Sequence, residues 1–479
     1  MDYQFLLKSS RQEAVSSRQR LLYLNLRESI AAARLPAGHR LPGSRALAEQ
    51  LTIARNTVVH AYEQLCSEGY LLSSRQGTVV AALPTPPRRR AGETRRTARL
   101  SSRVRQLPPA EEKREELWPF TPGVPALDAF PLADWQAAIK RTFQSLEACD
   151  LGYAESRGNA ALRAAISDRL RVARGLRCSA EQVIITGGTL NALHICSHLL
   201  GEQGDIVWME NPGYAGGRAV FAAAGMKVHP MSTDASGMTT ADPSAHPAPR
   251  FIYLTPSHQW PLGGVLPMPR RLELLALAHE HGAWILEDDY DSDFRYGGEP
   301  LVALQGLIED PPVIYLGTFS KTLFPGLRLG YLVAPQEVIE PLRASLAALR
   351  RHGRQIEEAT LARFMLEGRY TRHLSRMRKL YWERRQALQA ALVRYLPELE
   401  VLGAEAGLHL VVLLPPGVDD LEICERAARR GLNPQPLSHC YDSGTRKKTG
   451  LILGYGNTPL NAMDRCVRTL ARCVGDSSV

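Results

Sequence analysis

The chain has 479 residues, too many for one ordinary hydrophobic core, so we expect two or more domains. Hydrophobic residues at 44% and charged residues at 22% are typical of a soluble globular protein, and the lack of a long apolar run excludes a membrane-spanning one. Residues 1–117 hold 20 Lys and Arg against 11 Asp and Glu; subtracting these from the totals of 58 and 49 leaves 38 against 38, so the whole net charge of +9 lies in this first quarter.

The basic first quarter indicates either a polyanionic partner for an N-terminal module or only a solubilising basic surface. The N-terminal stretch lacks the continuous apolar region of a signal peptide. The eight Cys include no CxxC pair, so the sequence indicates neither a metal site nor a disulfide framework. Both observations favour a reducing, cytoplasmic location.

The first 80 residues have the pattern of three helices and a hairpin. Arg18–Ala33 carries apolar residues at helical spacing, and a short helix follows with Ser44 as its expected N-cap. A turn at 52–54 leads to a third helix from about Arg55 to Glu68, and Tyr70–Val80 is expected to form a two-stranded wing. This order places the polar start of the third helix where it can enter a major groove of DNA.

The stretch LPGSRALAEQL, followed after three residues by RNTVVHAYEQLCSEGYLLSSRQGT, resembles the winged helix-turn-helix of GntR-type regulators over about residues 18–80. The resemblance implies that double-stranded DNA is a partner, since arginine can bind guanine edges, asparagine adenine edges and threonine phosphates or thymine methyls. For Arg45, a cap or an ion pair within its own helix is the alternative. The DNA contacts that the resemblance implies are Arg45, Arg55, Asn56, Thr57, Arg75 and Gly77.

Residues 82–117 are rich in Pro and Arg and show no apolar periodicity. We expect an extended linker there, between a DNA-binding domain at 15–81 and a body at 118–479. The linker arginines either add a salt-sensitive attraction to DNA phosphates or only keep the linker soluble.

From Val183 onward, strands and helices alternate, as an α/β fold with a mostly parallel sheet requires. The carboxyl ends of such strands are where these sheets bind ligands. The strand Val183–Ile185 ends in a glycine turn that opens a helix and can present backbone N–H groups to a phosphate. The strand Asp205–Met209 leads to Tyr214, whose ring can stack on a flat heterocycle or pack into the core.

The strand Ala283–Leu286 is followed by four acids within five residues. A carboxylate at this place can hold a protonated pyridine nitrogen, because a positively charged ring acts as an electron sink. The remaining acids either orient the site or face water.

The strand Val313–Leu316 turns into a segment that offers Thr318, Ser320 and Lys321, with Arg328 seven residues beyond the lysine. A lysine in such apolar surroundings suits an amine that forms a Schiff base with a cofactor aldehyde. The hydroxyls and the guanidinium suit phosphate oxygens. A solvated surface lysine is the alternative.

The segment GTFSKTLFPGLRLGY resembles the lysine motif of fold-type I pyridoxal 5'-phosphate (PLP) enzymes. More narrowly, the chain resembles MocR-type regulators, which join a GntR-type winged helix to an aminotransferase-like body. This resemblance implies a homodimer, PLP as cofactor and Lys321 as its Schiff-base residue. The other implied cofactor contacts are Gly188, Thr189, Leu190, Thr318, Ser320 and Arg328 for the phosphate region, Tyr214 on the ring, Asp288 at the pyridine nitrogen, Tyr290 at the phenolic oxygen, and Tyr153 from the partner subunit.

Two features bear on activity and effector. The segment TPSHQWPLG has Trp260 where many aminotransferases have an asparagine, a departure that is characteristic of MocR-type chains. The last strand of the expected small C-terminal subdomain, about 399–479, lacks the arginine that holds a substrate carboxylate, and Arg446 upstream is the nearest substitute. The effector is therefore expected to be a small amine, an amino acid held in another way, or PLP itself.

Three hypotheses follow. The first is a PLP-binding transcriptional regulator whose body senses a small molecule, with residual transaminase chemistry left open. The second is a working aminotransferase that carries a DNA-binding module. The third is a DNA-binding protein whose body has lost its cofactor. The motif residues argue against the third hypothesis, and the two departures above argue against the second.

Overall fold

The computed structural model describes residues 3–7, 17–83, 101, 117–240, 243–297, 301–349, 353–442, 444–445 and 448–475. The chain forms two compact units, Met1–Arg99 and Leu100–Val479. Most of the predicted linker, at 84–100 and 102–116, and Arg446 lie outside the described residues.

The N-terminal unit is the predicted winged helix-turn-helix. Its apolar helix faces and the wing enclose a core that includes Leu22, Leu47 and Leu65. The prediction of Ser44 as an N-cap is wrong, because Gly43 takes that position and the Ser44 hydroxyl instead accepts a 3.5 Å hydrogen bond from Arg55 Nε. Its elements are a 3-10 helix at Gln4–Leu7, α1 at Arg18–Ala31, α2 at Ser44–Leu51, α3 at Arg55–Ser67, β1 at Leu71–Ser74 and β2 at Gly77–Val80.

The second unit is built on an eight-stranded sheet of order β3-β10-β9-β8-β7-β4-β5-β6. The five strands from β9 to β5 are parallel, whereas β10 is antiparallel to both of its neighbours, so β3 runs in the same direction as β9. The strands are β3 Val183–Thr186, β4 Ile206–Asn211, β5 Lys227–Asp234, β6 Gly237–Met238, β7 Phe251–Leu254, β8 Trp284–Asp289, β9 Val313–Thr318 and β10 Gly330–Val333.

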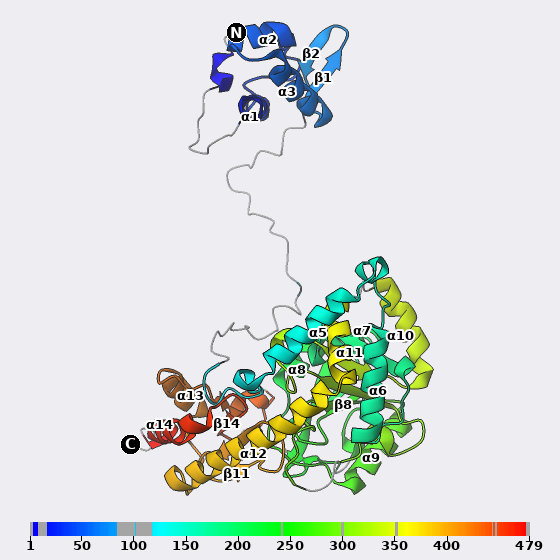
Figure 1. The fold of residues 1–479 in the computed structure, drawn as a ribbon, viewed down its shortest axis with the longest axis vertical. Helices are drawn as coiled ribbons and strands as arrows, with labels where there is room; N and C mark the ends of the chain where they lie inside the picture. Colours follow the sequence, from blue (N-terminus) through cyan, green and yellow to red (C-terminus); the bar gives the residue numbers. More distant parts are fainter. Residues whose placement is uncertain are drawn as a thin grey trace. The chain divides into compact units, whose positions relative to one another are not determined.

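The central strands begin with continuous apolar runs because the sheet is covered on both faces. Alternate residues of β4 enter two different cores: Val207 and Met209 join one, and Trp208 joins the other. Figure 1 shows helices packed around this sheet. The helices of the unit are α5 Leu132–Gln144, α6 Ala160–Arg174, α7 Thr189–Leu199, α8 Ala215–Ala223, α9 Met268–His281, α10 Gln336–Leu349, α11 Gln355–Leu366, α12 Arg369–Tyr395, α13 Asp420–Ala428 and α14 Met463–Gly475.

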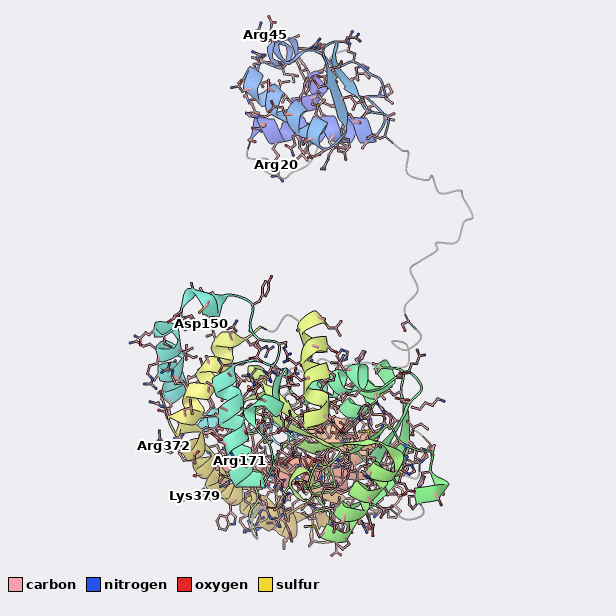
Figure 2. The ribbon with its side chains drawn as sticks, turned by 90° about the vertical axis from the view of Figure 1, so that its right-hand side faces the viewer. Arg20, Arg45, Asp150, Arg171, Arg372 and Lys379 are labelled. Atoms are coloured by element: carbon pink, nitrogen blue, oxygen red, sulfur yellow. The ribbon has the colours of Figure 1, made fainter. Side chains whose placement is uncertain are left out.

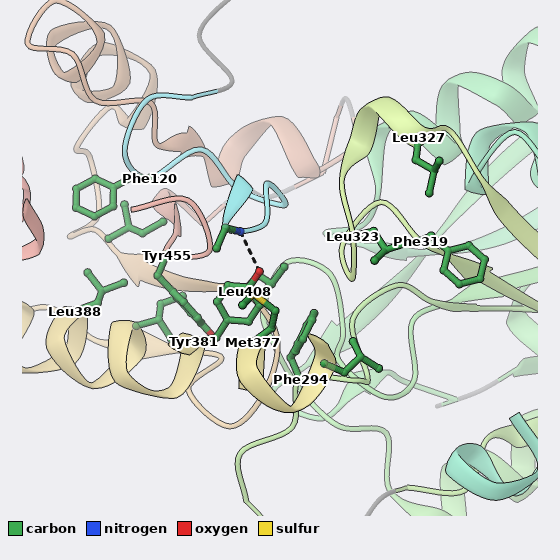
Figure 3. Packing of buried hydrophobic residues seen from close by; sticks show 14 of the residues in the cluster. Phe120, Phe294, Phe319, Leu323, Leu327, Met377, Tyr381, Leu388, Leu408 and Tyr455 are labelled. Atoms are coloured by element: carbon green, nitrogen blue, oxygen red, sulfur yellow. Dashed lines mark hydrogen bonds between the residues drawn. The ribbon is translucent and has the colours of Figure 1, made fainter. Parts of the chain in front are cut away.

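A smaller four-stranded antiparallel sheet of order β11-β12-β14-β13 lies at the end of the long helix α12, as Figure 1 shows in yellow to red. Figure 3 shows Tyr381 and Leu388 of α12 in one apolar cluster with Phe120 and Tyr455, so the small and large subdomains share a core. The strands of this sheet are β11 Val401–Leu402, β12 His409–Leu413, β13 Gln435–Pro436 and β14 Gly450–Gly454.

One strand is longer than the sequence predicts. The prediction ends it at Leu286, but β8 continues through Glu287, Asp288 and Asp289. These acids stay in the sheet because strands on both sides pair with them, with Glu287 opposite Leu254 and Asp288 opposite Leu316. Their carboxylates are therefore buried within the sheet edge instead of facing water.

Candidate functional site

The strand ends converge on one cavity of about 300 Å³. It lies at the carboxyl ends of the sheet strands and also receives residues from the small subdomain and from the segment before α5. Of the eleven predicted cofactor contacts, the cavity is lined by ten: Gly188, Thr189, Leu190, Tyr214, Asp288, Tyr290, Thr318, Ser320, Lys321 and Arg328. Tyr153 is the exception, and its side chain is 83% exposed on this subunit.

Lys321 follows β9 and is half-buried in the cavity. Its Nζ donates a 2.7 Å hydrogen bond to the backbone oxygen of Gly123. Burial lowers the pKa of the Lys321 amine, an effect that Asp291 and Asp288 oppose. A lowered pKa increases the fraction of neutral amine, which is the form that attacks an aldehyde.

The glycine turn after β3 forms one end of the cavity. Gly188 is the N-cap of α7 and has a φ of +99°, a left-handed conformation that favours glycine. No side chain caps this helix start, and a Cβ at Gly188 would lie 3.9 Å from Arg328 Nη2. Backbone donors and a guanidinium thus converge where an anion can be held.

Asp288, at the end of β8, also lines the cavity, and it is only 5% exposed. Its Oδ2 accepts a 2.6 Å hydrogen bond from the Tyr253 hydroxyl, while Oδ1 is buried without a hydrogen-bond partner among the described residues. Burial raises the pKa of Asp288 to about 7, although the Tyr253 hydrogen bond acts in the opposite direction. A buried carboxylate oxygen of this kind is suited to a cationic donor in the cavity.

The neighbouring acids do not face water. Glu287 accepts backbone N–H groups at 2.9 and 3.2 Å, Asp289 pairs with Arg174 at 2.7 Å, and Asp291 contacts His258 Nδ1 at 3.0 Å. Of the two interpretations left open by the sequence, the structure therefore favours acids that orient the site.

The aromatic residues form the rest of the wall. Tyr214 is the N-cap residue of α8, and burial raises the pKa of its hydroxyl to about 12. The Tyr290 hydroxyl donates to the backbone oxygen of His258 at 3.0 Å. Trp260 packs against Tyr290 and His409 with ring centroids 6.0 and 4.7 Å away, so an indole fills the position that an asparagine has in many aminotransferases.

Several cavity residues were not predicted from the sequence: Pro122, Gly123, Tyr253, Thr255, Trp260, Pro325 and Gln435. Tyr253 and Thr255 could have been found, because they close a strand whose carboxyl end faces the ligand edge. Gly123 and Gln435 carry no comparable local signal.

In the N-terminal unit, four of the six predicted DNA contacts are exposed, whereas Thr57 and Gly77 are half-buried. Arg55 and Asn56 are exposed at the start of α3, Arg45 is exposed on α2, and Arg75 lies in the turn of the wing. Arg45 makes no ion pair within the described part of the chain, which removes the alternative of a salt bridge within its helix. Figure 2 shows Arg45 and Arg20 on opposite sides of this unit.

These features define the class: a helix-turn-helix transcriptional regulator with an aminotransferase-like body. Residues 19–80 match the family described as "Bacterial regulatory proteins, gntR family", and residues 119–443 match "Aminotransferase class I and II". The chain is 38% identical to the probable rhizopine catabolism regulatory protein MocR of Rhizobium meliloti, over 94% of this chain and 92% of that protein. It belongs to the MocR-type regulators of the GntR family.

Two further relatives are informative. The pyridoxine biosynthesis transcriptional regulator PdxR of Corynebacterium glutamicum is 35% identical, with 90% of each chain covered. The crystal structure of LysN, an α-aminoadipate aminotransferase from Thermus thermophilus, matches 79% of this chain and 95% of its own with a TM-score of 0.69 and 28% identity. That structure holds N-(5'-phosphopyridoxyl)-L-leucine. No helix among the described residues is long and apolar enough to cross a membrane.

Proposed function

We propose that this regulator binds PLP in the cavity and that the bound cofactor lets the body sense a small molecule. The main evidence is that Lys321 and Asp288 line one cavity, and that Oδ1 of Asp288 is buried without a hydrogen-bond partner among the described residues. A phosphorylated pyridine aldehyde needs an amine for its aldehyde and a carboxylate for its ring nitrogen. The phosphopyridoxyl compound held by LysN supports the same assignment.

The remaining cavity residues fit the other parts of the cofactor. Backbone N–H groups of Gly188, Thr189 and Leu190 at the start of α7 would hold the phosphate together with Thr318, Ser320 and Arg328. Tyr214 would cover the ring. Tyr290 has one hydroxyl hydrogen, which now bonds the His258 carbonyl, and would turn it to the phenolic oxygen of the bound cofactor. When bound, PLP supplies an aldehyde that accepts primary amines and a ring that withdraws electrons.

The effector that we propose is a small amine, an amino acid or PLP itself. Lys321 and Arg328 are the cationic side chains among the lining residues, and both are assigned to the cofactor. The described last strand of the small subdomain, β14, is apolar, and the neighbouring lining residue on β13 is Gln435, a neutral amide. These observations favour a ligand that is recognised through its amine more than through a carboxylate.

We also propose a homodimer in which Tyr153 contacts the partner's cofactor phosphate. Leu151, Tyr153 and Leu349 are exposed by 72, 83 and 75%. Gln355 Nε2 donates to Gly152 O at 2.9 Å, which ties the loop of Leu151 and Tyr153 to the start of α11, close in sequence to Leu349. Large apolar side chains exposed in this way are suited to contact with a second copy of the chain.

In this proposal the protein is cytoplasmic, and residues 15–81 form its DNA-binding domain. Residues 82–117 link this domain to the sensing body at 118–479. Two copies of the winged helix in a dimer match the paired half-sites that such motifs bind. The assigned DNA contacts are Arg45, Arg55, Asn56, Thr57, Arg75 and Gly77.

The cofactor assignment predicts a spectroscopic signature. Full-length protein mixed with PLP should gain an absorbance band near the visible edge, and borohydride should attach the cofactor covalently. Lys321→Ala should keep its circular dichroism spectrum but lose both signals, because it has no amine for the aldehyde. Absence of the band in the wild-type protein would contradict the cofactor assignment, and steady transamination of an amino acid with a keto acid would contradict the role as a sensor.

The ionisation of Asp288 predicts that the affinity for PLP depends on pH. Because the pKa of Asp288 is raised to about 7, its carboxylate is protonated below that pH, and PLP affinity should fall as the pH drops through about 7. Tyr253→Phe removes a hydrogen bond that stabilises the carboxylate, so the midpoint should move upward by about one pH unit. Tyr315→Phe is the matched control, because its hydroxyl donates to Asp289 outside the cavity. An unchanged midpoint in Tyr253→Phe would refute this role of Asp288.

The assignment of DNA contacts predicts that one substitution in the winged helix weakens DNA binding. Arg55→Ala should weaken binding to the operator by about 1–3 kcal/mol and relax the preference for one base pair, as measured by gel shift over a set of operator variants. Arg20→Ala is the matched control, because it removes the same charge from the side of the unit opposite Arg45. Equal affinity and equal preference in Arg55→Ala and the wild type would rule out the contact.

A further inference from the structure

A short segment crosses the cavity at the point where the chain enters the body. We call residues 118–126 the strap. They are the first part of the body after the linker region, and Pro122 and Gly123 within them line the cavity. The strap is thus the part of the body through which the candidate cofactor site is joined to the linker region and the DNA-binding domain in the sequence.

The first part of the strap is attached to the small subdomain. The N–H of Phe120 donates to Thr458 Oγ1 at 3.0 Å, and the Phe120 carbonyl accepts the N–H of Gly454 at 2.9 Å. Asn457 Nδ2 donates to the Trp118 carbonyl at 2.7 Å. The Phe120 ring is fully buried in the cluster that Figure 3 shows beside Tyr455.

The middle of the strap is held by Lys321. Besides the 2.7 Å bond from Lys321 Nζ to the Gly123 carbonyl, the two residues are in close contact, since a Cβ at Gly123 would lie 2.6 Å from Nζ. Gly123 also has a φ of +73°, which favours glycine. The strap therefore lies over the lysine amine with no space for a side chain between them.

We propose that Lys321 has two mutually exclusive partners, the Gly123 carbonyl and an aldehyde, and that the strap reports to the linker which of them is bound. This inference rests on the proposed cofactor function. Condensation of the neutral amine with an aldehyde forms a carbon–nitrogen double bond, and both amine hydrogens leave with the aldehyde oxygen as water. A neutral imine nitrogen has no hydrogen to donate, and the single hydrogen of a protonated imine would bond the phenolic oxygen beside the aldehyde carbon. The Gly123 carbonyl would therefore lose its donor in either form.

A primary amine as effector reverses the change. When it takes the place of Lys321 on the aldehyde carbon, its two hydrogens pass to Nζ, and Lys321 becomes a free amine again. The bond to Gly123 can then re-form. A backbone carbonyl without a partner is unfavourable, so the two arrangements of the strap differ in free energy and a ligand can shift their populations.

Hydrogen exchange of the strap amides in the full-length protein tests this. Exchange at Phe120 and Thr121 should rise about tenfold on addition of PLP, the size expected when one hydrogen bond that holds the segment is lost. Methylamine added to the PLP-loaded protein should lower it again. Lys321→Ala should exchange rapidly in all three conditions.

The absorbance band and the increase in mass after borohydride treatment distinguish failure of the strap inference from failure of the cofactor function. A loaded protein with unchanged strap exchange would overturn the strap inference and leave the cofactor function intact. If the protein shows neither the absorbance band nor the increase in mass, the cofactor function itself is overturned, and with it this inference.

A pair of glycine variants tests the connection to DNA. Gly123→Ala places a methyl group against Lys321, whereas Gly431→Ala imposes a similar backbone conformation, φ of +75°, with nothing within 4 Å. In Gly123→Ala the operator affinity should no longer respond to PLP, and in Gly431→Ala the response should equal that of the wild type. A wild-type response of both strap exchange and DNA affinity in Gly123→Ala would refute the inference, and if that variant fails to fold, the Lys321→Ala exchange data decide.

Discussion

Burial of carboxylates at the end of β8 is the constraint on which the site depends. Removing a charged carboxylate from water is unfavourable unless hydrogen bonds or an opposite charge compensate it. Four acids are buried here, and their partners come from separate parts of the body, so the acids tie those parts to the sheet edge. The pairs are Glu287 with the backbone of Leu304 and Gln305, Asp288 with Tyr253, Asp289 with Arg174, and Asp291 with His258. Within this group, Asp288 Oδ1 is a buried oxygen without a hydrogen-bond partner among the described residues, and Asp288 lines the cavity.

Short-range patterns were enough to predict most of the fold and ten of the residues that line the cavity. Lys321, Asp288 and Gly188 meet in one cavity because each follows or ends a strand that points to the same edge of the sheet. The contact of Gly123 with Lys321 spans 198 residues, and no local pattern records such a pairing. The length of β8 was missed for a related reason, since acids remain in a strand only when distant partners compensate their burial.

The same body architecture serves transaminases, so the fold alone does not separate a sensor from an enzyme. In our proposal, the difference lies in the residues around the candidate cofactor cavity. The backbone N–H of Trp260 donates to Thr255 Oγ1 at 2.8 Å, and that hydroxyl donates to the buried Glu210 at 2.7 Å. The segment is therefore fixed with an indole at a position where an amide would donate to a cofactor oxygen. This arrangement agrees with the family of regulators to which the chain belongs.

Charge distribution limits how the body can influence DNA binding. The excess of +9 lies in residues 1–117, and residues 118–479 have equal numbers of acidic and basic side chains. Attraction to phosphates is long-ranged and depends on such an excess of positive charge, and the body adds no net charge to it. A ligand in the cavity must then act through geometry: either through the spacing of two winged helices in a dimer, or through the segment that connects each one to its cavity. The strap belongs to the second route, and because its middle rests on Lys321, the chemistry of one amine is sufficient to change how that connection is held.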